Sequence, residues 1–108
     1  MARTAEQNRK LISDWLAAFK AANPGVTYPV SANYLPGGWV SISQDGHRTT
    51  HRPSKVEAMI ERLRERAAFL EGFADASALH QRMNTYPDGS KCAEKYELGY
   101  SRSMQENG

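Results

Sequence analysis

Residues 37–57 read GGWVSISQDGHRTTHRPSKVE, and this stretch decides the fold. Val40 and Ile42 alternate with polar residues, which is the period-two pattern of a half-buried strand. Asp45-Gly46 follows, a pair that tolerates the positive φ angles of a tight hairpin turn. The residues from His47 to Arg52 are therefore expected to return as the neighbouring antiparallel strand.

The residues before this hairpin predict another strand. Apolar and polar residues alternate from Val26 to Tyr34, and Pro36-Gly37-Gly38 then turns the chain. Pro29 cannot donate to a ladder, so this strand is expected at an edge of the sheet or broken at the proline. Tyr28 and Tyr34 share the phase of the valines, so both are expected to face the core.

A helix is expected at the start of the chain. Thr4 is a suitable N-cap and Gln7 completes a capping box, while Asn23-Pro24-Gly25 ends the helix. Its apolar residues recur at helical spacing, which is typical of a helix packed on a core. They are Leu11, Ile12, Trp15, Leu16, Ala18, Phe19 and Ala22.

The most regular helical pattern follows the hairpin. Pro53 closes the last strand, Ser54 and Glu57 form the pattern of a second capping box, and Gly72 is a natural stop. The outer face has mixed charge, as expected for a solvated surface. The apolar stripe contains Val56, Met59, Ile60, Leu63, Ala67 and Leu70, and the outer face contains Glu57, Glu61, Arg62, Arg64, Glu65 and Arg66.

The remaining residues give a weaker pattern. A further helix is expected from Asp75 to Met83, a turn at 85–89, a short helix from Ser90 to Leu98, and a frayed tail at about 101–108. The expected fold is α+β: an N-terminal helix, a three-stranded antiparallel β-meander, a long helix and one or two short C-terminal helices. With 108 residues, the chain is expected to form a single domain over 1–108.

The amino-acid composition limits the functional classes to which the protein could belong. Hydrophobic residues make up 40% and charged residues 24%, which is the range of a folded globular domain. A net charge of +2 and a pI near 8.8 exclude both a histone-like basic protein and an acidic DNA mimic. Cys92 is the only cysteine, and neither a signal peptide nor a membrane-length apolar run is present. The expected protein is soluble and cytoplasmic, without membrane association.

The predicted strand 47–52 carries the first candidate site. Side chains two apart share a face, so Arg48, Thr50 and Arg52 line one side, and the two histidines with Thr49 line the other. Lys55 follows at a helix start, where backbone N–H groups favour anions. The cations would suit a phosphate backbone or an acidic protein surface. Alternatively, they defend an edge strand against pairing with another sheet.

No residue pattern indicates an enzyme. His47 and His51 would lie roughly 13 Å apart along a strand, too far to share one Zn²⁺. Cys92 with His80 or His51 could form a nucleophilic pair, but SKCAEKYE has as many acids as bases, and no thiol-enzyme signature is present. The sequence predicts no catalytic residues, no metal site and no cofactor.

Trp39 is the aromatic residue expected to be partly exposed, because it lies out of phase with Val40 and Ile42. Trp and Arg are the residues most enriched at protein–protein hot spots, which favours a protein partner. Tyr28, Tyr34 and Trp39 could instead form a stacking platform for single-stranded nucleic acid.

Residues 37–67 resemble small accessory proteins of temperate bacteriophages and prophages. The likeness rests on an aromatic strand, a polar turn and an Arg-bearing strand that leads into a helix of the type S-x-[IV]-E-x-M-x-x-x-L. The matching residues are Gly38, Trp39, Arg52, Ser54, Val56, Glu57, Met59 and Leu63. The resemblance implies a stoichiometric inhibitor of host machinery, a class that includes the anti-CRISPR proteins.

Together these observations predict a non-enzymatic binding protein, phage-derived, that inhibits a host defence complex, with a CRISPR effector as the first candidate. The partner would be a host protein or a ribonucleoprotein complex. The alternative is a small basic regulator that binds DNA or RNA, and the oligomeric state stays open. The candidate contact residues are Trp39, Arg48, His51, Arg52, Lys55 and Arg62.

Overall fold

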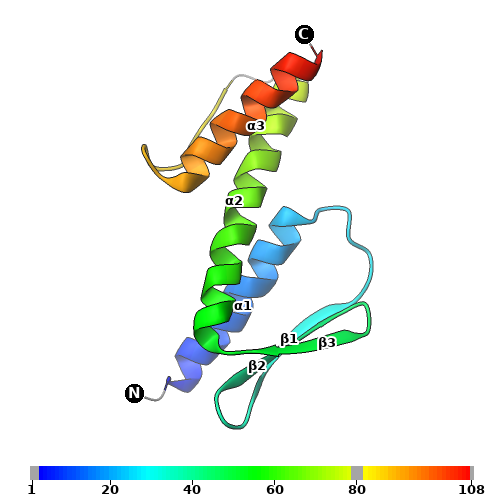
Figure 1. The fold of residues 1–108 in the computed structure, drawn as a ribbon, viewed down its shortest axis with the longest axis vertical. Helices are drawn as coiled ribbons and strands as arrows, with labels where there is room; N and C mark the ends of the chain where they lie inside the picture. The colour runs from blue at the N-terminus through cyan, green and yellow to red at the C-terminus, as the bar shows by residue number, and fades with distance from the viewer. Residues whose placement is uncertain (1–2, 79–81, 108) are drawn as a thin grey trace. The chain divides into compact units, whose positions relative to one another are not determined.

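The computed structural model describes residues 3–78 and 82–107. An N-terminal helix, a three-stranded antiparallel sheet, a long helix and a C-terminal helix follow one another, so the expected α+β class is confirmed (Figure 1). The elements are α1 (Ala5–Ala22), β1 (Val30–Leu35), β2 (Trp39–Gln44), β3 (His47–His51), α2 (Pro53–Ser77) and α3 (Lys91–Asn107).

The chain divides into two compact units, residues 1–62 and residues 63–108. The boundary falls inside α2, which contributes its first ten residues to the first unit and the rest to the second. That the chain folds as a single domain over 1–108 stays a prediction.

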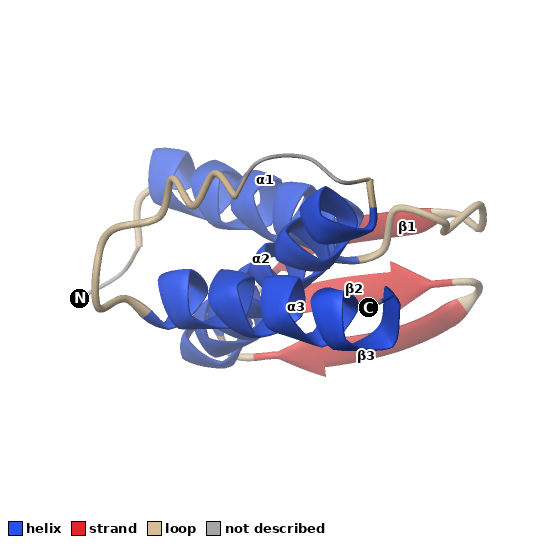
Figure 2. Cartoon of the chain, turned by 90° about the horizontal axis from the view of Figure 1, so that it is seen from above, coloured by secondary structure: helices blue, strands red, loops and turns tan. Residues whose placement is uncertain are grey.

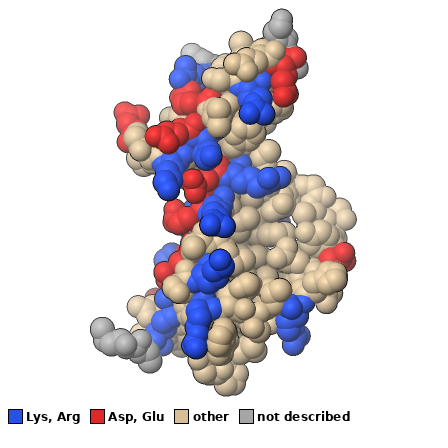
Figure 3. Space-filling model, viewed as in Figure 1, with Lys and Arg blue, Asp and Glu red and all other residues tan. Residues whose placement is uncertain are grey.

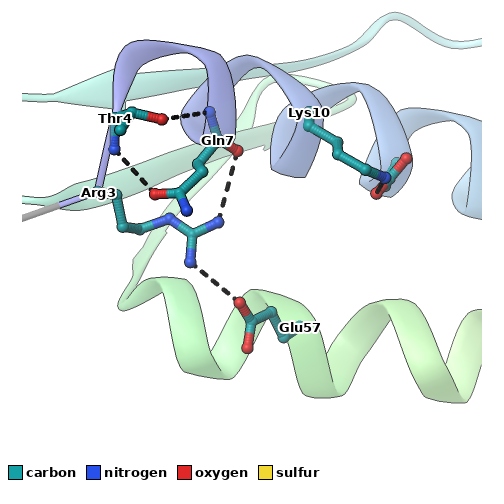
Figure 4. Close-up of polar contacts among 6 residues, drawn as sticks. Arg3, Thr4, Gln7, Lys10 and Glu57 are labelled. Atoms are coloured by element: carbon teal, nitrogen blue, oxygen red, sulfur yellow. Dashed lines mark hydrogen bonds and ion pairs between the residues drawn. The ribbon is translucent and has the colours of Figure 1, made fainter.

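α1 begins and ends as the sequence predicts. The Thr4 hydroxyl accepts from Gln7 N at 3.1 Å, and Gln7 Oε1 accepts from Thr4 N at 2.9 Å, which completes the capping box (Figure 4). At the other end, Asn23 Nδ2 donates to the Phe19 carbonyl at 3.0 Å. These bonds satisfy backbone groups that a helix terminus would otherwise leave unpaired.

The strands form the expected meander in the order β1-β2-β3 (Figure 2). Val40 pairs with Tyr34 on one side and His51 on the other, and the rest of the register follows from these pairs. Asp45 has a φ of 51° and Gly46 a φ of 82°, the two positive angles of a tight hairpin turn. The predicted Asp-Gly hairpin is confirmed.

The first strand is shorter than predicted. β1 starts at Val30, directly after Pro29, because the proline ring leaves no N–H for the ladder. The Pro29 carbonyl still accepts from Asp45 N at 3.1 Å. β1 lies at an edge of the sheet, as expected, but Tyr28 precedes it and is 37% exposed. Tyr28 is therefore not buried in the core, contrary to the prediction.

The core of the first unit lies against one face of the sheet. Ala32, Val40 and Ile42 point to this face and are buried, and α1 packs on β1. The buried residues of α1 are Leu11, Trp15, Ala18, Phe19 and Ala22, and those of the first turns of α2 are Val56 and Ile60.

α2 begins two residues earlier than the predicted capping box requires, because a helix with Ser54 as its N-cap would begin at Lys55. Pro53 is its first residue, where a proline loses no helical hydrogen bond. Ser54 is therefore the second residue of the helix and not its N-cap, so the predicted capping box at Ser54 is wrong. Glu57 instead accepts from Arg3 Nη1 at 3.0 Å, which ties α2 to the residue before the N-cap of α1 (Figure 4).

The predicted helix stop at Gly72 is also wrong. α2 continues through Gly72 to Ser77, because the glycine is needed for packing inside the second unit. A Cβ atom at Gly72 would lie 2.0 Å from the Tyr96 carbonyl oxygen, and one at Gly99 would lie 2.0 Å from the Phe69 carbonyl oxygen. Only residues without a Cβ allow the backbones of α2 and α3 to come this close.

Small residues extend this contact along both helices. Ala68 and Ala76, each four residues from Gly72, are buried, and so is Ser103, four residues after Gly99. Ser103 Oγ lies 2.6 Å from Ser77 Oγ, so the buried hydroxyl has a partner. The second unit is therefore built on a tight crossing of two helices.

The C-terminal third differs most from its prediction. Asp75 belongs to the end of α2, and Arg82 and Met83 are not helical, so the helix predicted from Asp75 to Met83 is wrong; its Leu79 and His80 lie outside the described residues. The turn at 85–89 is confirmed by the bond from Ser90 N to the Pro87 carbonyl. α3 is one helix of 17 residues, not a short helix followed by a frayed tail.

Candidate partner-binding surface

The strand register places a set of polar side chains on the face of the sheet opposite the core. Residues paired directly across antiparallel strands share a face. Trp39, Ser41 and Ser43 alternate with the buried Val40 and Ile42, so they and their partners point away from the core. We call this surface the outer sheet face; its residues are Ser31, Asn33, Leu35, Trp39, Ser41, Ser43, Arg48, Thr50 and Arg52.

Trp39 and Arg52 touch each other on this face. Arg52 follows His51, the partner of Val40, so it lies across from Trp39. The Arg52 guanidinium carbon lies 4.0 Å from the centre of the Trp39 ring, a cation–π contact. Trp39 remains 38% exposed, so the pair is available at the surface. The predicted exposure of Trp39 is confirmed.

The outer sheet face has cations and no acids. Arg48 and Arg52 are both exposed, and among the described residues neither forms an ion pair with a carboxylate. Ser41 is buried, at 5%, because Asn33 and Thr50 flank it on the neighbouring strands, and Leu35 and Ser43 are half-buried. A docking partner would therefore meet two exposed guanidinium groups, one of them stacked on Trp39.

His51 lies on the opposite side of the sheet from these arginines. It pairs with Val40, is half-buried, and has its Nε2 2.8 Å from Thr49 Oγ1. Within the described residues, no group of three or more His, Cys, Asp and Glu side chains could hold a metal ion.

Lys55 lies in the first turn of α2, three residues after Arg52. The amides of Lys55 and Val56 both donate to the Arg52 carbonyl, at 3.0 and 3.1 Å. Pro53 has no N–H. Among the residues 53–56 of this first turn, only the Ser54 amide therefore does not donate to the Arg52 carbonyl. The expected anion site at this helix start is therefore reduced to the Lys55 side chain, which is exposed.

Arg62 is separated from the outer sheet face by its place in α2. It lies seven residues after Lys55 on the same side of the helix, about 10 Å further along the axis. Its sequence neighbours include Glu61 and Glu65, and acidic side chains are interspersed with basic ones on the face of the molecule that Figure 3 shows. Of the six candidate residues, the structure thus places Trp39, Arg48 and Arg52 on one face, and of these Trp39 and Arg52 are in contact.

Five polar residues of the outer sheet face were not among the candidates. Each lies on the same face as Trp39 through the register; they are Ser31 and Asn33 of β1, Ser41 and Ser43 of β2 and Thr50 of β3. The alternation in the sequence indicates which residues of one strand share a face. It does not show which residues of neighbouring strands pair with each other. These residues add side-chain donors and acceptors beside the arginines.

In the second unit, charged and phenolic groups are paired internally. Glu97 accepts from Asn84 Nδ2 at 3.0 Å and forms an ion pair with Arg82. The hydrogen bond from Asn84 lowers the pKa of Glu97, and Arg82 lowers it further, although burial acts in the opposite direction. The network fastens the segment before α3 to that helix.

Two tyrosines complete this arrangement. Tyr86 donates to Glu71 Oε2 at 2.7 Å, and burial together with this bond raises the pKa of Tyr86 to about 12. Tyr96 is fully buried, donates to Asp75 and accepts from Met83 N at 3.0 Å. Burial and the Asp75 carboxylate raise the pKa of Tyr96.

In the part of the chain that the structure describes, no helix has the length and apolar character needed to cross a bilayer. Cys92, the one cysteine of the chain, is half-buried. Comparison with protein-family models, with curated proteins and with solved structures found no match to this chain.

Proposed function

We propose that this chain is a non-enzymatic binding protein whose outer sheet face docks on a host defence complex and inhibits it, with a CRISPR effector as the first candidate. The observation that carries the proposal is the exposed Trp39–Arg52 pair, with Arg48 on the same face and no acid among the residues of that face. The resemblance of residues 37–67 to phage accessory proteins supports the inhibitory role.

The chemistry of the face favours an acidic protein surface. A guanidinium binds a carboxylate through two parallel hydrogen bonds, and such charge-assisted bonds are stronger than neutral ones. An aromatic ring beside an arginine supplies apolar contact area and holds the guanidinium in place before docking. Arg48 and Arg52 are the residues expected to make the charged contacts, with Trp39 as the apolar anchor.

A DNA- or RNA-binding regulator is the second candidate. Ser31, Ser43 and Thr50 lie beside the arginines, and side-chain hydroxyls and Arg are common donors to phosphate oxygens. This reading predicts binding that weakens steeply as salt is raised, because each neutralised phosphate releases condensed counterions.

Affinity capture from a bacterial host lysate, with and without nuclease, tests both candidates. A protein target should be retained in both samples, should bind again when purified, and should lose its activity in the complex. The matched variants are Arg48→Glu/Arg52→Glu and Lys91→Glu/Lys95→Glu, which have the same net charge and differ in which surface is reversed.

The outcomes separate the candidates. Retention that survives nuclease and is lost only with the Arg48→Glu/Arg52→Glu variant supports the inhibitor. Retention that nuclease abolishes, with direct binding to DNA or RNA in the purified state, replaces it with the nucleic-acid regulator. A target held equally by both variants would remove the outer sheet face from either function.

A further inference from the structure

A cavity in the first unit lies on the core side of the sheet, where α1 ends and the chain approaches β1. It has a volume of about 290 Å³ and is partly open. Apolar side chains and polar groups contribute about equally to its walls, and Lys20 is the one charged residue among those that line it. The lining includes Leu16, Phe19, Lys20, Val26, Tyr28 and Val30.

The cavity exists because the strand ladder starts late. Val26 and Tyr28 have the alternation of a strand but precede β1, so no neighbouring strand covers them. Tyr28 is 37% exposed and Val26 is half-buried, which leaves apolar surface around a concave space. A small molecule with an apolar body would remove this surface from water.

The charge of Lys20 determines which polar group a ligand of this cavity would carry. Lys20 is a cationic residue that lines the cavity and is exposed, and among the described residues it has no carboxylate partner. The carboxyl end of α1 contributes the opposite sign, but this amounts to only about half an elementary charge. The net preference is therefore for an anion whose apolar part enters the cavity.

We propose that this cavity is a binding site for small amphiphilic carboxylates, with the apolar body between Phe19 and Val26 and the carboxylate at Lys20. The site is independent of the outer sheet face, and its ligand does not need to be the partner proposed above.

Phe19 connects the site to a spectroscopic reporter. Its ring is stacked on that of the buried Trp15, with centroids 5.2 Å apart. Because the chain has two tryptophans, Trp39→Phe leaves Trp15 as the only one, and its emission reports on ligand beside Phe19. The probes are 4-phenylbutyrate and its neutral counterpart 4-phenylbutanol, titrated to about 10 mM, a range suited to a ligand of this size.

Saturable binding of 4-phenylbutyrate is expected, with weaker binding of the alcohol. Lys20→Met keeps the apolar stem and should weaken the carboxylate roughly two- to fivefold, as for an exposed ion pair, without affecting the alcohol. Arg9→Met removes an exposed cation of the same helix outside the cavity and should leave both affinities unchanged. Val26→Phe should fill the cavity and abolish binding of both probes.

Amide shifts in the ¹H–¹⁵N spectrum of the unaltered protein keep the test independent of whether Val26→Phe folds. The expected shifts fall at residues 16–30 and leave β3 unchanged. No saturable binding, or shifts confined to other residues, would overturn the site. Equal affinity for acid and alcohol, or equal loss in Lys20→Met and Arg9→Met, would overturn the assignment to carboxylates.

Discussion

Residues 1–62 and residues 63–108 use their polar side chains in different ways. In the second unit, Glu97, Tyr86 and Tyr96 each bond to other side chains of the same unit. In the first unit, Arg3 and Lys10 have carboxylate partners, but the arginines of the outer sheet face have none among the described residues.

This difference indicates that the polar side chains of the second unit stabilise the fold, whereas those of the outer sheet face are available for binding. Paired groups in a partly buried network hold a loop and two helices together, whereas an exposed arginine stacked on a tryptophan adds little to folding. Substitutions in the second unit are therefore expected to act on the free energy of unfolding. Substitutions on the outer sheet face are expected to act on binding.

The largest expected effect tests the helix crossing of the second unit. Gly72→Ala places a Cβ atom 2.0 Å from the Tyr96 carbonyl oxygen, so the two backbones must move apart. We expect a loss of about 3 kcal/mol in the free energy of unfolding, measured by urea denaturation. Gly25→Ala is the control, because no atom lies within 4 Å of its Cβ position. Equal stability of the two variants would contradict the tight crossing.

Tyr96→Phe tests the buried hydroxyl that joins Asp75 and Met83. Removing it leaves the half-buried Asp75 carboxylate and the Met83 amide without this partner, so a loss of about 2 kcal/mol is expected in the same denaturation experiment. Tyr28→Phe, at a residue 37% exposed, should change stability by less than about 0.5 kcal/mol. If the two variants lose the same amount, the hydroxyl contributes nothing specific.

The contribution of Glu97 to the free energy of unfolding should depend on pH, which tests the network of the second unit further. Its pKa is lowered in the folded state, so its stabilising contribution is complete above the ordinary glutamate pKa of about 4.3. That contribution is lost as the pH falls through the lowered pKa. Glu97→Gln should therefore be less stable than the unaltered protein near neutral pH, by about 1 kcal/mol, and the gap should narrow in acid.

The same pH series needs a matched control. Glu94→Gln removes an exposed carboxylate from the same helix and should show no comparable gap. A constant difference between Glu97→Gln and the unaltered protein from neutral to acid pH would show that the ionised carboxylate is not the stabilising form.

The smallest expected effect concerns the first unit. A double-mutant cycle of Trp39→Leu and Arg52→Gln should give a coupling energy of about 0.5–1 kcal/mol, the size of an exposed cation–π contact. The cycle of Trp39→Leu with Arg48→Gln should be additive. A coupling above about 2 kcal/mol would place Arg52 among the residues that stabilise the fold.

Local patterns predicted the first unit well because its signals are short-range. The capping box at Thr4, the Asp45-Gly46 turn and the alternation around Val40 each depend on residues close in sequence. They also predicted that Arg48 and Arg52 share a face and that Trp39 is exposed. The error at Tyr28 arose because alternation alone does not show where a ladder begins.

The second unit was predicted poorly because its decisive contact joins residues far apart in sequence. The sequence pattern predicted that the helix ends at Gly72, since a glycine at the end of an apolar stripe commonly ends a helix. Its partner in packing, Gly99, lies 27 residues away. The small residues Ala68, Gly72 and Ala76 recur at intervals of four, and this spacing was the available sign of a close helix contact.

The most direct test of the account is the affinity of the purified partner for two variants of equal net charge. Arg48→Glu/Arg52→Glu reverses the outer sheet face, and Lys91→Glu/Lys95→Glu reverses two exposed lysines of α3. We predict a loss of at least about a hundredfold for the first, as for two charged interface contacts, and less than about threefold for the second. Equal losses, or a greater loss for the α3 variant, would contradict the claim that partners dock on the outer sheet face.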